Sequence, residues 1–418
     1  MNIKFRLTFM SFLQFFVWGA WLITIANYWF GTKQWGSSEF GAIFATLGIS
    51  SIFMPTITGI IADRWVNAEK LYAGLHILSG LTVCTLPLVN DPNTFFWIML
   101  LAMCFYMPTI SLSNSIAFNA LKSAKFDVVK VFPPIRVWGT IGFIVAMWVT
   151  NLTGNKATVN QFYISAFASF VLGVYSFTLP KCAPQLQNIA NSSIVNTLGL
   201  DAFKLFANYK MALFFIFSML LGAALQLTNM YGDVYLDDFR KIPEYTNSFV
   251  VQYSTIIMSI SQISETLFIL AIPFFLKKFG IKNVMLISMF AWVLRFGLFA
   301  FGNPAEGLWM IILSCIVYGM AFDFFNISGS LFIETETDSK MRSSAQGLFM
   351  MMTNGFGAII GSLISGYVIQ NFFTNDNGSK DWQPIWLTFA LYSMIVAILF
   401  ALFFKHKHDP NNLSKIKH

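Results

Sequence analysis

Charged side chains are scarce in this chain of 418 residues, because Asp, Glu, Lys and Arg together make up only 11% of it. Soluble domains carry roughly 25% charged residues, so the composition excludes an ordinary soluble protein. Hydrophobic residues instead account for 56% of the sequence. The composition therefore predicts an all-α membrane protein that crosses the lipid bilayer many times.

Cysteine and histidine are also rare, with four of each. The cysteines are far apart and follow no disulfide or metal-binding spacing, so we expect no metal site and no cofactor. Three of the histidines lie in the C-terminal tail, which argues against a histidine proton relay inside the membrane. The net charge of +7 reflects basic cytoplasmic loops in a membrane protein, so we expect no nucleic-acid partner.

Twelve segments are long and apolar enough to cross a membrane, which takes about 20 residues each. They lie at roughly 8–30, 41–61, 71–89, 94–118, 135–152, 160–180, 211–235, 247–276, 283–302, 307–333, 343–372 and 384–404. The first is too long and too aromatic for a cleaved signal peptide. One connection is long and polar, and it divides the twelve segments into two halves of six. The predicted organisation is an N-terminal bundle at 1–180, a cytoplasmic central loop at 181–210, a C-terminal bundle at 211–404 and a tail at 405–418.

Lys and Arg are unevenly distributed between the two alternating sets of connections. Nineteen fall on the side that also holds both termini, and five fall on the opposite side. Because cytoplasmic loops of membrane proteins are enriched in Lys and Arg, this asymmetry predicts that both termini are cytoplasmic.

Two carboxylates interrupt the apolar segments, Glu265 in the eighth and Asp323 in the tenth. An acid at the middle of a membrane costs about 2.5–3.5 kcal/mol, so it usually faces a cavity and serves a function. Each acid has a carboxamide three residues away, Gln262 and Asn326 respectively, on the same face of its helix. A polar stripe on an apolar helix indicates a path for a solute.

A third polar pair, Gln226 and Asn229, occupies the seventh segment with the same spacing. Such amides can simply join membrane helices through hydrogen bonds. Three pairs in one half of the chain, two of them with carboxylates, favour a shared binding site instead. These groups bind hydroxyl and N–H groups, and Tyr318 and Phe322 offer flat faces for stacking. A solute with hydroxyls and a flat heterocycle fits this set, and so does a sugar.

Three further charged residues lie within or near the apolar segments. Arg136 begins the fifth segment, with Thr140 and Phe143 on the same face, and it points either into a cavity or to the cytoplasmic surface. We interpret Arg295 as a structural residue or one that extends to the membrane surface. Asp233, near the outer end of the seventh segment, is expected to be solvated.

The sequence GIIADRW at 59–65 is expected in the short connection between the second and third segments. It resembles the motif found there in the major facilitator superfamily. Asp63 is suited to cap a neighbouring helix and to pair with a basic residue, so Asp63 and Arg64 are predicted gating residues. Trp65, Val66 and Asn67 stand where the motif usually has a second glycine and a basic pair.

Longer blocks are similar to the bacterial nucleoside:proton symporters, the nucleoside permeases of the major facilitator superfamily. These blocks are SFLQFFVWGAW at 11–21, FPPIRVWGTIGFI at 132–144, IFSMLLGAALQLTNM at 216–230, TIIMSISQISETLFIL at 255–270, YGMAFDFFNISGS at 318–330 and SAQGLFMMMTNGFG at 344–357. The resemblance implies the major facilitator fold, with twelve transmembrane helices in two six-helix bundles around a central cavity. It also implies that a monomer takes up nucleosides such as uridine and adenosine, together with protons, across the bacterial inner membrane.

The resemblance further implies a nucleoside site built from ten residues of this chain. They are Arg136, Thr140, Phe143, Gln226, Asn229, Gln262, Glu265, Tyr318, Phe322 and Asp323. One of the two acids, Asp323 or Glu265, is expected to carry the coupling proton, because burial disfavours the charged form of an acid. Ala224 stands where the family carries a glutamate, so this chain must function without that acid.

Three alternatives remain open on the residues alone. A proton-coupled sugar permease would use similar chemistry, and a receptor would bind its solute without accumulating it. An intramembrane enzyme would use the two carboxylates as acid and base. The sequence contains no metal-ligand cluster, nucleophile motif or phosphate-binding loop, so we expect a transporter rather than an enzyme.

Overall fold

The computed structural model of the chain describes residues 2–184, 200–338 and 341–406. The chain forms two compact units: unit 1 comprises Met1–Ser193 and Asn229–Val234, and unit 2 comprises Ile194–Thr228 and Tyr235–His418. The predicted central loop and C-terminal tail lie partly outside the described residues. The predicted domain boundaries therefore remain a prediction.

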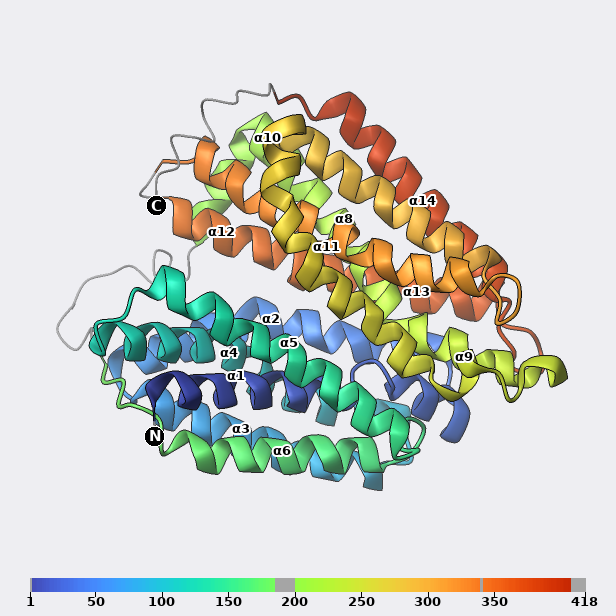
Figure 1. Ribbon diagram of the computed structural model, residues 1–418, viewed down its shortest axis with the longest axis horizontal. Helices are drawn as coiled ribbons and strands as arrows, with labels where there is room; N and C mark the ends of the chain where they lie inside the picture. The colour runs from blue at the N-terminus through green and yellow to red at the C-terminus, as the bar shows by residue number, and fades with distance from the viewer. Residues whose placement is uncertain (1, 185–199, 339–340, 407–418) are drawn as a thin grey trace. The chain divides into compact units, whose positions relative to one another are not determined.

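Unit 1 is built from helices, because an apolar segment in a membrane must satisfy its backbone hydrogen bonds internally. They are α1 (Ile3–Gly19), the π-helix η1 (Asn27–Thr32), α2 (Ser37–Arg64), α3 (Ala68–Thr85), the short η2 (Leu86–Leu88), α4 (Pro92–Ser123), α5 (Val128–Leu152) and α6 (Asn160–Ser176). In Figure 1, α1 packs along α5 and α6, and α3 packs along α4 and α6.

Two glycines bring α1 and α5 to backbone contact. A Cβ atom at Gly19 would lie 2.5 Å from the carbonyl oxygen of Phe143. A Cβ atom at Gly142 would lie 2.1 Å from the carbonyl oxygen of Phe12. No other residue fits at such distances, and small residues are what allow membrane helices to approach so closely. This contact sets the position of the part of α5 that carries Phe143.

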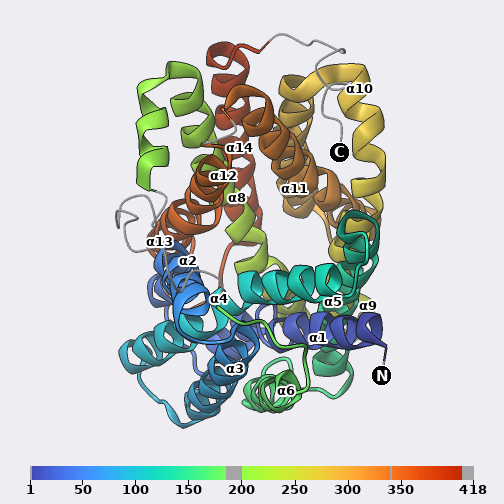
Figure 2. The same cartoon turned by 90° about the vertical axis from the view of Figure 1, so that its left-hand side faces the viewer.

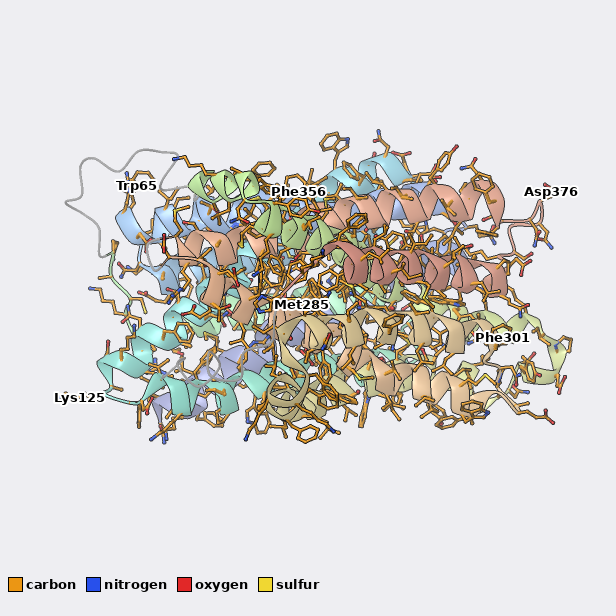
Figure 3. The ribbon with its side chains drawn as sticks, turned by 90° about the horizontal axis from the view of Figure 1, so that it is seen from above. Trp65, Lys125, Met285, Phe301, Phe356 and Asp376 are labelled. Carbon is orange, nitrogen blue, oxygen red and sulfur yellow. The ribbon has the colours of Figure 1, made fainter. Side chains whose placement is uncertain are left out.

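Helices also make up most of unit 2, and its described residues carry no strand beyond an isolated bridge between Thr374 and Lys380. Its elements are η3 (Leu200–Ala207), α8 (Tyr209–Asp238) without its stretch Asn229–Val234, η4 (Phe239–Lys241), η5 (Pro243–Tyr245), α9 (Phe249–Gln252), α10 (Ser254–Phe301), α11 (Leu308–Glu336), α12 (Arg342–Met350), the π-helix η6 (Met351–Gly357), α13 (Ala358–Phe372) and α14 (Trp382–Phe403). Helix α10 packs against α11 and α14. In the side-chain view of Figure 3, Phe301 and Asp376 lie toward the same end of this unit.

Helix α10 holds two of the predicted spans, and Gly280 separates them. Gly280 has a φ of 76°, a backbone conformation that favours glycine, and it breaks the helix at this point. Figure 2 shows the two limbs of α10 joined at the resulting turn. The predicted spans at 247–276 and 283–302 are therefore joined by a very short turn.

Nine helices in the described part of the chain are long and apolar enough to cross a membrane. One of them is α10, with its two predicted spans. The predicted span at 8–30 coincides with α1 and η1, which are interrupted between Gly19 and Asn27. The predicted span at 160–180 coincides with α6, which is shorter. Each of the twelve predicted spans therefore coincides with helical structure.

The prediction that GIIADRW forms a connection is wrong for most of its length. Helix α2 continues to Arg64, so Asp63 and Arg64 lie in its last turn and Trp65 is its C-cap. Nothing in this stretch breaks a helix, because Gly59 alone weakens a helix without ending it. The helix therefore continues past its apolar part, and Trp65 and Lys125 lie toward one end of unit 1 in Figure 3.

Candidate functional site

The first limb of α10 and α11 touch at backbone distance beside the predicted acids. A Cβ atom at Gly319 would lie 2.6 Å from the carbonyl carbon of Ser264 and 2.7 Å from the amide nitrogen of Glu265. The hydroxyl of Ser264 also donates a hydrogen bond to the carbonyl oxygen of Ile316. The glycine and the serine therefore hold the backbone of Glu265 against the turn of α11 that precedes Asp323.

Asp323 is a buried carboxylate, and one of its two oxygens has no hydrogen-bond donor. Its side chain lies in α11 and is 4% exposed, and its Oδ2 atom accepts no hydrogen bond. Glu265, which is half-buried, lies near enough to interact with it electrostatically. The structure thus brings the two predicted coupling carboxylates together within unit 2. A buried acceptor without a partner costs about 1–3 kcal/mol, so this oxygen is suited to receive a proton or a ligand donor.

The predicted stacking residues form an aromatic group on the same helix. The rings of Tyr318 and Phe322 are 5.8 Å apart between centroids and lie 3° from parallel. Trp292, on the second limb of α10, meets Tyr318 edge-on at 5.9 Å. Phe322 and Trp292 also line a cavity of about 10 Å³, which has room for roughly one water molecule. Trp292 is a neighbour of the site that the sequence pattern did not identify, because its spacing along α10 is ordinary for packing.

The carboxamides of unit 2 differ in how well they are satisfied. Gln226 in α8 is buried, at 8% exposed. The Oε1 atom of Gln262 is buried and accepts no hydrogen bond, so it can receive one from a solute. Asn326 donates to the carbonyl oxygen of Phe322 at 3.2 Å, which is a bond within its own helix. Asn229, one turn beyond Gln226, belongs to unit 1.

The three predicted residues of α5 form a separate group in unit 1. The guanidinium of Arg136 lies 4.0 Å from the centroid of the Phe15 ring on α1, so it packs on an aromatic face. Phe143 is buried and meets Trp18 edge-on at 6.3 Å, while Thr140 is half-buried. Joining this group and the unit 2 group into one nucleoside site remains a prediction.

Two charged residues of the apolar segments lie in buried positions. Arg295 is fully buried in the second limb of α10, which excludes a position at the membrane surface and agrees with the other interpretation, a structural residue. Asp233 is 1% exposed and accepts a hydrogen bond from the amide of Asn27, so the prediction that it is solvated is wrong. In both cases the hydrogen-bond partners lie far away in the sequence. They include Thr228 and Ser261 for Arg295, and Asn27 for Asp233. Within the described residues, no cluster of acids, histidines or cysteines has the arrangement of a metal site.

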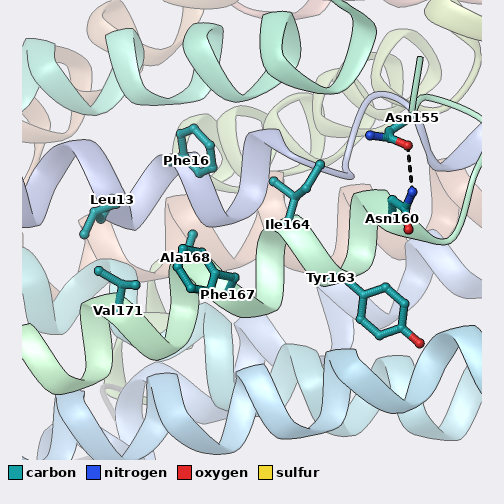
Figure 4. Close-up of a pocket in the computed structure, with 9 residues that line it drawn as sticks. All are labelled: Leu13, Phe16, Asn155, Asn160, Tyr163, Ile164, Phe167, Ala168 and Val171. Carbon is teal, nitrogen blue, oxygen red and sulfur yellow. Dashed lines mark hydrogen bonds between the residues drawn. The ribbon is translucent and has the colours of Figure 1, made fainter. Parts of the chain in front are cut away.

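None of the predicted site residues lines the groove in Figure 4. It has a volume of about 540 Å³ and runs between α1 and α6 in unit 1. Apolar side chains line most of it, and Asn155 and Asn160 form a hydrogen bond of 2.9 Å at one end. Its lining suits lipid contact better than the recognition of a polar solute.

The chain is similar along its whole length to known transporters. A model of the nucleoside H+ symporter family matches residues 1–409. The nucleoside permease NupG of Escherichia coli (strain K12) is 51% identical over 421 residues, which cover 100% of both chains. The xanthosine permease of the same organism is 51% identical over 419 residues, covering 100% of this chain and 99% of the relative.

Two crystal structures of the nucleoside transporter NupG, one of them of a mutant, match this structure with TM-scores of 0.91 and 0.93. Each is 51% identical and covers 97% of this chain and 100% of the matched chain. This agreement confirms the predicted all-helical major facilitator fold.

Proposed function

This chain belongs to the nucleoside H+ symporter family, and from that premise we propose that it carries nucleosides inward together with protons, with Asp323 or Glu265 as the coupling carboxylate. The family and its permease relatives are transporters, so the chain is a transporter and not an enzyme. Alternating access between two open states is the mechanism we propose, as in other transporters built from repeats.

The observation that carries the coupling proposal is the unsatisfied Oδ2 atom of buried Asp323 beside Glu265. Two carboxylates in a poorly hydrated place repel each other when both are ionised, and one bound proton removes that repulsion. This arrangement is the reason for proposing one of the two acids as the coupling carboxylate. Coupling follows if the loaded state, with proton and nucleoside both bound, favours the change between open states.

The groups around this acid pair suit a nucleoside. The parallel rings of Tyr318 and Phe322 offer faces against which a base can stack, at about 1–3 kcal/mol per base. The free acceptor of Gln262 and the buried amide of Gln226 are suited to hydrogen bonds with the base and ribose. Arg136, Thr140 and Phe143 are proposed to complete the site from unit 1, together with Asn229.

The proposal is tested by uptake of radiolabelled uridine, adenosine and xanthosine into transporter-deficient cells, with and without a protonophore. Xanthosine is included because a nucleoside permease and a xanthosine permease are both 51% identical to this chain. Accumulation that the protonophore abolishes is the expected result. Uptake that free sugars inhibit and nucleosides do not would point to a sugar permease, and binding without accumulation would point to a receptor.

We place the chain in the bacterial inner membrane as a multi-pass monomer with both termini in the cytoplasm. The multi-pass character rests on the apolar helices and on the transporter relatives. The orientation is supported by the excess of Lys and Arg in the connections that share a side with the termini. In this orientation the last turn of α2, with Asp63 and Arg64, lies on the cytoplasmic side, where we propose that the two residues act as gating residues.

A further inference from the structure

Arg295 is a buried charge that the proposed transport mechanism does not use. It lies in the second limb of α10 with 0% of its side chain exposed. A charged group inside a membrane helix is costly, and such residues are usually held by partners and serve a function. The partners of the guanidinium therefore indicate what this charge does.

Four hydrogen bonds from the guanidinium reach three different helical segments. It donates to the carbonyl oxygen of Ser314 on α11 at 2.6 Å and to Oγ1 of Thr228 on α8 at 3.3 Å. Two further bonds, of 3.3 and 3.4 Å, go to Oγ of Ser261 on the first limb of α10. In return, the Ser314 hydroxyl donates to the backbone carbonyl of Arg295 at 2.9 Å. One side chain thus ties α8, both limbs of α10 and α11 together.

The same guanidinium also packs on two aromatic rings. Its central carbon lies 4.7 Å from the centroid of Tyr318 and 5.2 Å from that of Phe299. Tyr318 is in turn parallel to Phe322 in the aromatic group of the site. An Arg–aromatic contact is strongest at desolvated positions such as this one.

Every segment that Arg295 reaches carries a residue of the proposed nucleoside site. Thr228 directly precedes Asn229, Ser261 directly precedes Gln262, and Tyr318 is itself a stacking residue. The guanidinium therefore holds Thr228 and Ser261, which are the chain neighbours of two proposed binding residues, and packs on the ring of Tyr318. Only a planar group with several fixed donors meets all of these partners at once, so lysine is not an equivalent replacement.

We propose that Arg295 is a positioning residue for nucleoside binding, which holds the Tyr318 and Phe322 rings in one orientation and keeps the three site-bearing segments in register. The rings are then already ordered before a base binds, so binding loses less side-chain entropy. This inference rests on the proposed function, because it assigns Arg295 a role in recognising the base.

The test is the concentration dependence of radiolabelled uridine uptake, reported as separate KM and maximal rates. Arg295→Met keeps an unbranched apolar stem and removes the charged guanidinium, and we expect KM to rise about tenfold. Arg295→Lys should recover only part of this loss. Phe299→Leu is the matched control, since it removes the other aromatic contact of Arg295 and should leave KM unchanged.

A double-mutant cycle separates positioning from simple scaffolding. If Arg295 acts through Tyr318, adding Arg295→Met to Tyr318→Leu should raise KM less than twofold further. Full tenfold effects in both backgrounds, or an unchanged KM in Arg295→Met, would overturn the proposal. If Arg295→Met does not reach the membrane, Ser261→Ala takes its place, with an expected rise in KM of about fivefold for the lost hydrogen-bond acceptor. An unchanged KM in that variant would also overturn it.

The wild-type protein separates the two proposals. Loss of all nucleoside accumulation in wild type would refute the proposed function, and this inference with it. Normal wild-type accumulation combined with an unaffected Arg295→Met would refute the inference alone.

Discussion

The unsatisfied oxygen of Asp323 is the residue-scale feature that most restricts the chemistry of the site. A folded protein rarely leaves a buried acceptor without a hydrogen bond, because burial removes its hydrogen bonds to water and no protein donor replaces them. Here one Asp323 oxygen and the Gln262 carbonyl oxygen are both in this condition within unit 2. A transporter that binds and releases both a proton and a solute needs acceptors that its own donors do not occupy.

Neutral replacements of the two acids should separate their roles. In Asp323→Asn and Glu265→Gln, the variant that has lost the coupling carboxylate should still equilibrate uridine but should no longer concentrate it. The other variant should keep concentrative uptake with weaker binding. The measurement is the accumulation ratio in membrane vesicles with an imposed pH gradient. Full gradient-driven accumulation in both variants would remove both acids as proton carriers.

Single residues were predictable from the sequence where their chemistry alone conflicts with a membrane. Asp323 and Glu265 are conspicuous because an acid has no reason to lie in an apolar segment unless it functions there. The surroundings of Arg295 and Asp233 were not predictable, because burial depends on which distant side chains cover a residue. Asn27, which covers Asp233, is 206 residues away in the chain.

At the scale of elements, helix contacts through glycine decide how closely the segments of each unit approach. The contact at Gly319 holds α11 against the backbone of Ser264 and Glu265. The sequence shows glycines but does not show which of them face another helix. The π-helices η1 and η6 were likewise not predicted, because one extra residue in a turn leaves no mark on hydropathy.

Gly319→Ala should weaken both folding and transport. The added methyl group would meet the backbone of α10, which cannot move aside, and overpacking of this kind costs about 1–3 kcal/mol. The thermal unfolding midpoint of the purified protein and its uridine uptake should both fall. Gly297→Ala is the matched control, because a Cβ atom there has nothing within 4 Å. Equal behaviour of the two variants would contradict the proposed role of this contact.

A polar network joins α1, α3 and α4 in unit 1 through Gln14. Its amide donates to Thr109 at 2.8 Å, and its carbonyl oxygen lies 2.9 Å from Nε2 of His76 and also accepts from Tyr72. All four side chains are fully buried. The network therefore joins the three helices through bonds that no water can replace.

Gln14→Leu should destabilise the fold, because it removes the partner of several buried polar groups at once. We expect the free energy of unfolding to fall by about 1–3 kcal/mol for each group left unsatisfied, measured by thermal unfolding in detergent. Gln383→Leu, at an exposed position of α14, serves as the control and should change little. A Gln14→Leu protein as stable as the control would show that the network contributes nothing.

At the scale of the whole molecule, the close packing inside each unit suits rigid-body movement. The glycine contacts in unit 1 and in unit 2 leave little freedom for helices of the same unit to slide. A transporter that rocks two rigid halves needs this internal stiffness. The spans were predictable because the thickness of the bilayer sets their minimum length, so apolar segments of that length can be recognised in the sequence. A single site built from both groups of residues stays a prediction.

The proposed orientation predicts the behaviour of reporter fusions. Green fluorescent protein fused after His418 should fluoresce, and alkaline phosphatase at the same place should be inactive, because the tail should be cytoplasmic. Alkaline phosphatase inserted at Asn377, in the connection between α13 and α14, should be active. The reverse pattern at either position would overturn the orientation.

The burial of Arg295 has a consequence for how the chain is made. A segment that carries a central arginine inserts poorly from the translocon by itself, at a cost of about 2.5–3.5 kcal/mol. Its hydroxyl partner Ser261 lies in the preceding limb of α10, and only the turn at Gly280 separates the two limbs. If the two limbs enter the lipid as a paired hairpin, Ser261 is at hand to bond the guanidinium as it leaves water. We therefore expect the two limbs to insert jointly rather than one after the other.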